Sequence, residues 1–221
     1  MSLLSIRNVS YCYQANSKEV IRQISINFEA GRLYVIIGKP ESGKTTLLSL
    51  IAGFSLPTEG QILYAGHDLS QWEFDQYRAK HIGIIYESHN LLMRATTVEN
   101  LELALEISQT KVGDKRKAAY KLLERLGINR DTAHVKVFKL TEEQQQLIAI
   151  AKAYISDPKL IIADEPSKNL SCQAEASIMS FFLEIAHEHR KCVIIVTNSR
   201  NIATYADEIW GINAGKMSFV R

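Results

Sequence analysis

One stretch of the chain combines the glycines, lysine and hydroxyl groups of a phosphate-binding loop. Residues 38–45 are Gly-Lys-Pro-Glu-Ser-Gly-Lys-Thr, which fits the pattern G-x-x-x-x-G-K-[ST]. Glycines let backbone N–H groups turn toward phosphate oxygens, Lys44 reaches the outer phosphates, and the Thr45 hydroxyl can hold Mg²⁺. The residues expected to bind phosphate are Gly38, Lys39, Pro40, Glu41, Ser42, Gly43, Lys44, Thr45 and Thr46.

A pair of acids that suits the same chemistry follows an apolar run later in the chain. Residues 160–163 are Leu-Ile-Ile-Ala, and Asp164 and Glu165 come directly after them. An acid at the end of a parallel strand lies at the carboxyl edge of the sheet, where the phosphate loop also lies. There Asp164 can hold Mg²⁺ and Glu165 can orient or deprotonate an attacking water. The two motifs together predict a Mg-nucleotide site with a general base.

The elements that would position these residues belong to an α/β fold. Four short apolar runs, rich in β-branched residues, have the composition of strands buried on both faces of a parallel sheet. Helical stretches separate them, and the opening 30 residues alternate as half-buried antiparallel strands do. Residues 88–155 show helical spacing instead, with Gly127 as a helix stop. The four runs are residues 33–37, 82–86, 160–163 and 193–197.

Length and charge place limits on the kind of protein. The chain has 221 residues, 46% of them hydrophobic, with a formal charge of +2, which fits one globular domain. The balanced charge gives no case for nucleic acid as a partner. No apolar run approaches the roughly 20 residues that cross a bilayer and no signal peptide is evident, so we expect any membrane role to need a partner chain. The cysteines follow no metal or disulfide spacing, which favours a reducing compartment: Cys12, Cys172 and Cys192.

The motifs, in this order, resemble the ATPase subunits of ABC transporters along essentially the whole chain. Tyr13 resembles the aromatic residue that stacks on adenine in that family. The lid-hinge segment is most similar to that of the lipoprotein-releasing, macrolide-exporting, peptide-resistance and cell-division ATPases. Besides Tyr13, the matching segments are the lid hinge (77–92, with 97–100), the signature position (140–146), the D-loop (165–170) and the closing strands (205–216).

The resemblance implies the P-loop NTPase fold of ABC ATPases, with a mainly parallel core sheet, an N-terminal antiparallel β-subdomain and an inserted helical subdomain. We expect a single ATP-binding domain over residues 1–221, with its core in 1–87 and 156–221 and the helical subdomain in 88–155. ATP and Mg²⁺ are the implied cofactors.

The same resemblance implies two protein partners. One is a second ATP-binding subunit, paired head to tail so that each phosphate loop faces the other's signature helix. The other is an integral-membrane permease, which would hold the chain on the cytoplasmic face of the membrane. For the permease contact we expect residues 87–94, where Leu91, Leu92 and Met93 are either apolar anchors or ordinary packing.

Several departures from the family fall on chemistry. The lid-hinge Gln, which senses Mg²⁺ and the attacking water, is Glu87 here. The switch His is Asn198, whose neutral amide forms hydrogen bonds but does not take up or release a proton as an imidazole does, and the final Asp of the D-loop is Ser171. The residues expected at catalytic positions are Glu165, Glu87 and Asn198, and those at metal positions are Thr45, Asp164 and Glu87.

The signature segment departs most. Thr141 and Gln144 have the spacing of a capping box, and Glu142 and Glu143 occupy the first turn of the expected helix. Carboxylates there stabilise a helix by about 0.3–1 kcal/mol each, but they present negative charge to a partner's nucleotide. We expect Thr141 and Gln144 to contact that nucleotide; a solvated helix start is the alternative.

Two functional hypotheses stay open. In the first, the chain is an ATPase of weakened activity that drives a separate permease. In the second, it is a catalytically degenerate, nucleotide-binding regulatory subunit paired with an active ATPase. Homodimers and heterodimers are both compatible with the motifs. We favour the ATPase because Asp164 and Glu165 are present and a general base is hard to replace.

Overall fold

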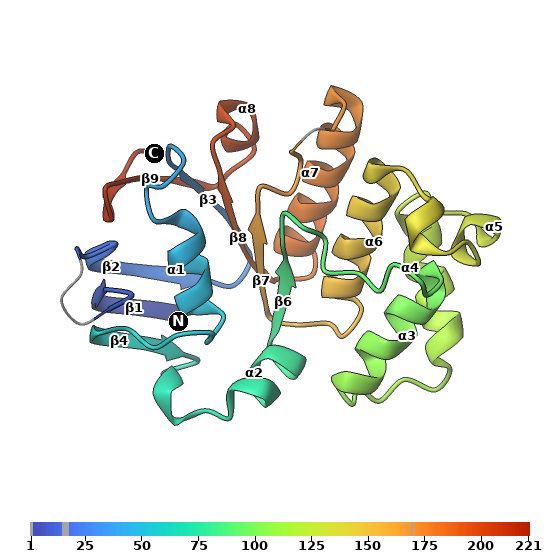
Figure 1. Ribbon diagram of the computed structural model, residues 1–221, viewed down its shortest axis with the longest axis horizontal. Coiled ribbons are helices and arrows are strands. Elements are labelled where there is room, and N and C mark those ends of the chain that lie inside the picture. The colour runs from blue at the N-terminus through green and yellow to red at the C-terminus, as the bar shows by residue number, and fades with distance from the viewer. Residues whose placement is uncertain (1, 15–17, 169) are drawn as a thin grey trace.

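Two sheets form the scaffold of the computed structural model, which describes residues 2–14, 18–168 and 170–221 (Figure 1). An antiparallel sheet has the order β2-β1-β4-β5, and a second sheet has the order β10-β9-β3-β8-β7-β6. In the second sheet every neighbouring pair is parallel except β9 and β10. The strands are β1 (Ser2–Tyr11), β2 (Ile21–Glu29), β3 (Arg32–Ile37), β4 (Glu59–Tyr64), β5 (His67–Asp68), β6 (Ile82–Ile85), β7 (Leu160–Asp164), β8 (Cys192–Thr197), β9 (Glu208–Asn213) and β10 (Lys216–Phe219).

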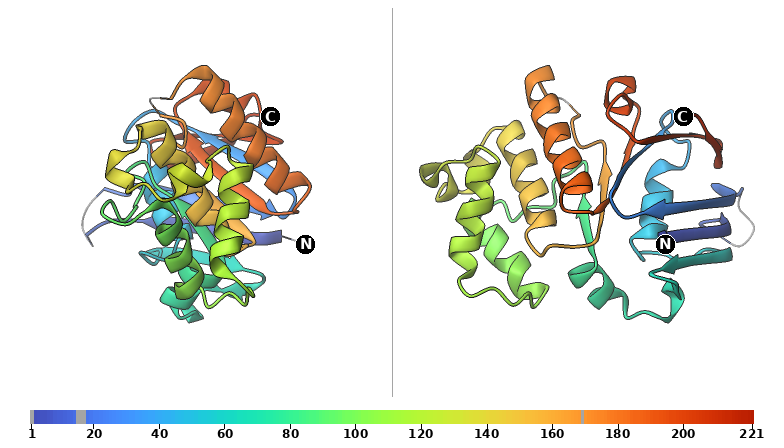
Figure 2. Two further views of the ribbon diagram at one scale, coloured as in Figure 1. Left: turned by 90° about the vertical axis from the view of Figure 1, so that its right-hand side faces the viewer. Right: turned by 180° about the vertical axis from the view of Figure 1, so that it is seen from behind.

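The helices are divided between the strands and a separate helical region. Helices α3 to α6 follow β6 and precede β7 in the sequence, and they lie together on the side of the molecule away from β1, β2 and β4 (Figures 1 and 2). The helices are α1 (Lys44–Ile51), α2 (Phe74–Lys80), α3 (Thr97–Ile107), α4 (Lys115–Arg125), α5 (Arg130–Ala133), α6 (Glu142–Tyr154), α7 (Cys172–His187) and α8 (Arg200–Ala203), with 3₁₀ turns η1 (Leu69–Gln71) and η2 (Val137–Lys139).

The parallel sheet is buried on both faces, as its composition predicts. Alternate residues of a strand point to opposite faces, so the sheet contributes to two cores. Leu33 and Val35 of β3 pack in one core with α7 and the helical region. Tyr34 and Ile36 pack in the other with α1 and the antiparallel sheet. The sheet is thus fixed from both sides, and its carboxyl edge becomes a rigid platform for side chains.

Local signals set the ends of the helices. Thr96 and Glu99 form a capping box at the start of α3, and the side chain of Asp114 caps α4. The stop expected at Gly127 coincides with the left-handed backbone that glycine favours: Gly127 has φ +77° and follows Leu126, the C-cap of α4. Among the described helices, none has the length and apolar character needed to cross a membrane. The α/β fold expected from the sequence is confirmed.

Candidate functional site

The phosphate loop connects the carboxyl end of β3 to the first residue of α1. Its backbone is left-handed at Glu41 (φ +62°) and at Gly43 (φ +106°). A Cβ atom on Gly43 would lie 3.0 Å from the carbonyl oxygen of Val20, so glycine suits both the turn and the close approach. The buried Lys44 ammonium group donates to the carbonyl oxygens of Gly38 (2.8 Å) and Lys39 (3.0 Å). Lys44 therefore closes the loop on itself.

A cavity of about 390 Å³ lies between this loop, the ends of β7 and β8, and the segment after β6. Most residues expected at the site line it, although they come from distant parts of the sequence. Gly38, Lys39 and Ser42 belong to the loop but do not line the cavity. The lining residues are Tyr13, Val20, Pro40, Glu41, Gly43, Lys44, Thr45, Thr46, Glu87, Asp164, Glu165, Lys168 and Asn198.

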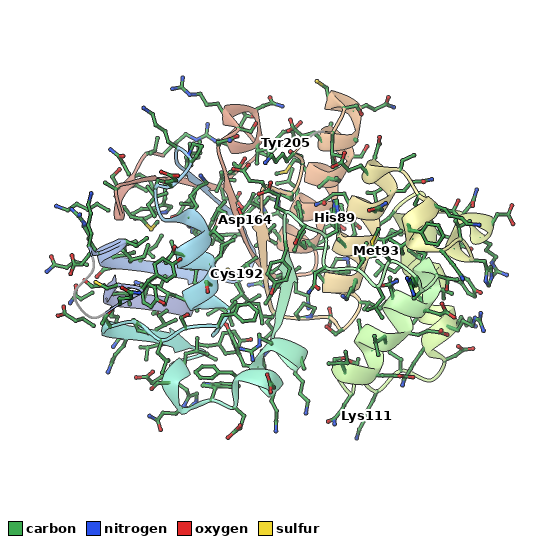
Figure 3. All side chains as sticks on the ribbon, viewed as in Figure 1. His89, Met93, Lys111, Asp164, Cys192 and Tyr205 are labelled. Carbon is green, nitrogen blue, oxygen red and sulfur yellow. The ribbon has the colours of Figure 1, made fainter. Side chains whose placement is uncertain are left out.

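Asp164 and the phosphate loop are in direct contact. The Thr45 hydroxyl donates a 2.8 Å hydrogen bond to Oδ2 of Asp164. Figure 3 shows Asp164 at the end of β7. Burial raises the pKa of Asp164, the nearby carboxylates of Glu165 and Glu87 raise it further, and the Thr45 hydrogen bond and Lys44 oppose the shift. The site therefore concentrates negative charge beside a hydroxyl, which suits a bound cation.

Glu165 is held in place by the end of β8. Its carboxylate accepts hydrogen bonds from the Thr197 hydroxyl (2.7 Å) and from the backbone N–H of Asn198 (3.0 and 3.2 Å to its two oxygens). Its own backbone is left-handed (φ +46°), and its N–H donates to the Val196 carbonyl oxygen. The carboxylate is thus oriented before any ligand binds. The sequence did not single out Thr197, although its place at the end of a buried strand beside β7 was a usable signal.

An ion pair between Glu87 and Lys168 occupies the same cavity. The hydrogen bond to Glu87 raises the pKa of Lys168, and the charges of Glu87, Glu165 and Asp164 add to that effect. Lys168 is a site residue that the sequence reasoning missed. The usable signal was its position in the loop that follows Glu165. Asn169 of the same loop lies outside the described residues.

Tyr13 extends from the antiparallel sheet toward the phosphate loop. Its ring is 66% exposed and packs edge-on against Tyr11, with 5.2 Å between ring centroids. The Tyr13 hydroxyl is hydrogen-bonded to Oγ1 of Thr46 at 2.8 Å. An exposed aromatic face beside a phosphate loop is suited to stacking on a nucleotide base.

Thr141 and Gln144 lie apart from the cavity, at the start of α6. The capping box predicted from their spacing is confirmed: the Thr141 side chain accepts from the Gln144 N–H, and the Gln144 side chain accepts from the Thr141 N–H. Glu142 and Glu143 occupy the first turn and are exposed. In a single chain these residues contribute nothing to the cavity.

The model for the ABC transporter family matches residues 21–168, from β2 through the phosphate loop to the loop after β7. The chain belongs to the ABC transporter family. It is 38% identical to the uncharacterized ABC transporter ATP-binding protein YclH of Bacillus subtilis (strain 168), over 94% of this chain and 92% of that protein. It is 32% identical to the lipoprotein-releasing system ATP-binding protein LolD of Pseudomonas syringae pv. tomato, over 98% and 97% respectively.

Structural comparison agrees with this membership. A dimeric post-hydrolysis state of the ATP-binding cassette MJ0796, bound to ADP and Pi, superimposes with a TM-score of 0.90. The two chains share 27% sequence identity, and the match covers 99% of each. The recognition of an ABC transporter ATP-binding protein from its sequence motifs is therefore confirmed.

A second, larger groove of about 430 Å³ separates the helical region of this ABC protein from α2 and β6. His89 and Asn90 line it, and Figure 3 shows His89 and Met93 on the segment that leads into the helical region. Leu91 packs against the core, whereas Leu92 and Met93 are exposed. Of these three apolar residues, Leu91 is explained by ordinary core packing, whereas Leu92 and Met93 are not.

Proposed function

We propose that this ABC transporter ATP-binding subunit binds Mg-ATP in the cavity of about 390 Å³ and hydrolyses it at a weakened rate to drive a separate permease. The observation that carries the proposal is the 2.8 Å hydrogen bond from Thr45 to Asp164. It joins the phosphate loop to the acidic strand end, so the two halves of the predicted site meet in one place.

The donor set suits Mg²⁺. Hard divalent cations prefer oxygen ligands, and here a hydroxyl and a carboxylate are already in contact. The partly buried carboxylate of Asp164 lies beside two other acids, and a bound cation would reduce the repulsion among them. Thr45 and Asp164 would hold the ion, and the Glu87 carboxylate would lie beside it. When bound, Mg²⁺ would neutralise charge on the transferred phosphoryl group.

The remaining roles follow from the same geometry. Lys44 exchanges its two loop carbonyl partners for the outer phosphates, and the unpaired N–H groups at the start of α1, from Lys44, Thr45 and Thr46, point toward them. Tyr13 stacks on the base. Glu165 accepts a proton from the attacking water, and the hydrogen bonds from β8 orient it for this task.

Three features support weakened hydrolysis. Position 87 has a carboxylate that forms an ion pair with Lys168, whereas the family has the neutral amide of Gln at this position. Asn198 contributes a backbone N–H to Glu165 but no titratable side chain. Glu142 and Glu143 would face the partner's nucleotide with negative charge. Thr141 and Gln144 are the side chains at that surface which would reach the nucleotide.

The exposed acids at α6 also support a second candidate function. A subunit that binds ATP through its own phosphate loop but offers its partner a repulsive signature surface would serve as a regulatory member of a pair with an active ATPase. In a homodimer an identical chain would complete this chain's nucleotide site with its signature surface. In a heterodimer a different ATPase chain would complete it.

The remaining assignments are part of the same proposal. The chain forms one ATP-binding domain, with a core in residues 1–87 and 156–221 and a helical subdomain in 88–155 that carries the signature. The integral-membrane permease docks along the groove lined by His89 and Asn90, with the exposed Leu92 and Met93 as apolar anchors. The subunit would then work in the cytoplasm, held at the membrane by the permease.

Phosphate release from Mg-ATP by the purified chain tests the enzyme role. We expect slow turnover that Glu165→Gln abolishes, because the amide cannot accept a proton. Turnover as fast as that of an ordinary transporter ATPase would show that the departures are harmless. Turnover that is unaffected by Glu165→Gln would remove Glu165 from its proposed role.

A further inference from the structure

Two charged side chains meet in the cavity at positions that the strands bring together. β6 and β7 are parallel neighbours, with Ile85 opposite Ala163. The segments that follow these strands therefore leave the sheet side by side, one carrying Glu87 and the other Lys168. The two side chains are 52% and 51% exposed, and they form an ion pair within the lining of the cavity.

The charges that line the cavity indicate what this ion pair does. Four carboxylates line the cavity, from Glu41, Glu87, Asp164 and Glu165, against the ammonium groups of Lys44 and Lys168. Lys44 is directed at its own loop, and Lys168 is the cation in contact with Glu87. An unpaired carboxylate at position 87 would add negative charge where a triphosphate has to bind.

We propose that Lys168 is a positioning residue for Glu87: it neutralises this carboxylate and holds it at the edge of the cavity, so that the triphosphate can bind. The idea rests on the proposed function, since it needs ATP to occupy the cavity. It makes the two residues a functional unit. A carboxylate at position 87 is compatible with nucleotide binding only while a cation at position 168 accompanies it.

A double-mutant cycle tests this dependence. Lys168→Met keeps most of the side-chain length but removes the charge, and Glu87→Gln removes the opposing charge. Equilibrium binding of ATP with Mg²⁺ would be measured for the wild type, both single variants and the double variant, at low and high salt. Lys168→Arg keeps the cation, and Lys121→Met removes an exposed lysine from α4 as a matched control.

We expect Lys168→Met to weaken ATP binding about two- to fivefold, the range typical of a partly exposed ion pair. High salt should reduce the loss. In the Glu87→Gln background the same lysine substitution should cost little, because no carboxylate is left unpaired. Lys121→Met should bind ATP like the wild type, and Lys168→Arg, which keeps the cation, should retain most of the binding that Lys168→Met loses.

The outcomes separate this idea from the function on which it rests. Equal losses from Lys168→Met in both backgrounds, or no loss in either, would overturn the positioning role and leave ATP binding intact. Absence of ATP binding by the wild type would overturn the proposed function and the positioning role together.

Discussion

The start of α6 carries two exposed carboxylates, Glu142 and Glu143, that stabilise the helix and that, under the proposed function, oppose nucleotide-driven pairing of subunits. Glu142 and Glu143 lie in the first turn, directly after the N-cap residue Thr141. The capping box uses the side chains of Thr141 and Gln144 only. Replacing both glutamates by glutamine therefore removes two charges and leaves the cap in place.

The cost to stability follows from the helix dipole. Each first-turn carboxylate contributes about 0.3–1 kcal/mol, so the double substitution should destabilise the chain by about 0.6–2 kcal/mol. For a protein of this size that corresponds to a fall in Tm of about 1–8 °C. Thermal unfolding of the nucleotide-free chain measures this loss.

The gain in pairing follows from Coulomb's law. Two unit charges about 8 Å apart in water repel by about 0.5 kcal/mol, and two glutamates facing a multiply charged triphosphate give several such terms. We expect the ATP-bound dimer to be more stable by about 1–2 kcal/mol, or about five- to thirtyfold in Kd. Salt should reduce this gain.

The assay is sedimentation of the chain with Mg-ATP in a Glu165→Gln background, in which the proposed role of Glu165 predicts no turnover. Glu99→Gln is the control for removal of a first-turn carboxylate: Glu99 lies in the first turn of α3, where its side chain also accepts a hydrogen bond from the N–H of the N-cap residue Thr96. We expect the double variant to dimerise more tightly and the control to dimerise like its parent. A double variant that melts earlier yet dimerises no better at any salt concentration would refute the charge argument.

Two further predictions concern pH and Mg²⁺. Burial raises the pKa of Asp164, so the native state binds this proton more tightly than the unfolded chain, and the resulting loss of stability grows as pH rises above the ordinary value of 3.8. Asp164→Asn should therefore raise the urea midpoint of the nucleotide-free chain at neutral pH but abolish Mg²⁺-dependent ATP binding; an unchanged or lower midpoint would contradict this. The backbone hydrogen bond from Thr96 lowers the pKa of Glu99, so its stabilising effect is complete above the ordinary value of 4.5 and is lost as pH falls through the lowered native value. Urea midpoints of the wild type and Glu99→Gln should differ at neutral pH and converge in acid, and a difference that persists in acid would argue against it.

Features that depend on local sequence could be predicted. The buried strands, the phosphate loop and the Thr141 capping box each follow from a pattern of neighbouring residues, and each lies where expected. A strand buried on both faces has to be apolar throughout, and a helix start has unpaired N–H groups that a threonine can satisfy.

Contacts between distant segments could not be predicted in the same way. The Glu87–Lys168 pair depends on β6 and β7 being neighbours, and the Thr197–Glu165 hydrogen bond depends on β7 and β8. No pattern within one segment encodes these pairings. Residues 91–93 lie in a loop, where no helical or strand period tells which of three apolar side chains turns inward. Only Leu91 does.

Equilibrium binding of Mg-ATP to the purified chain is the most direct test of the central claim. Lys44→Ala serves as the comparison, because it removes the ammonium group that closes the phosphate loop and is proposed to reach the outer phosphates. We predict saturable binding by the wild type and a large loss in the variant. Equal binding by both proteins, or binding by neither, would contradict the assignment of this cavity as the ATP site.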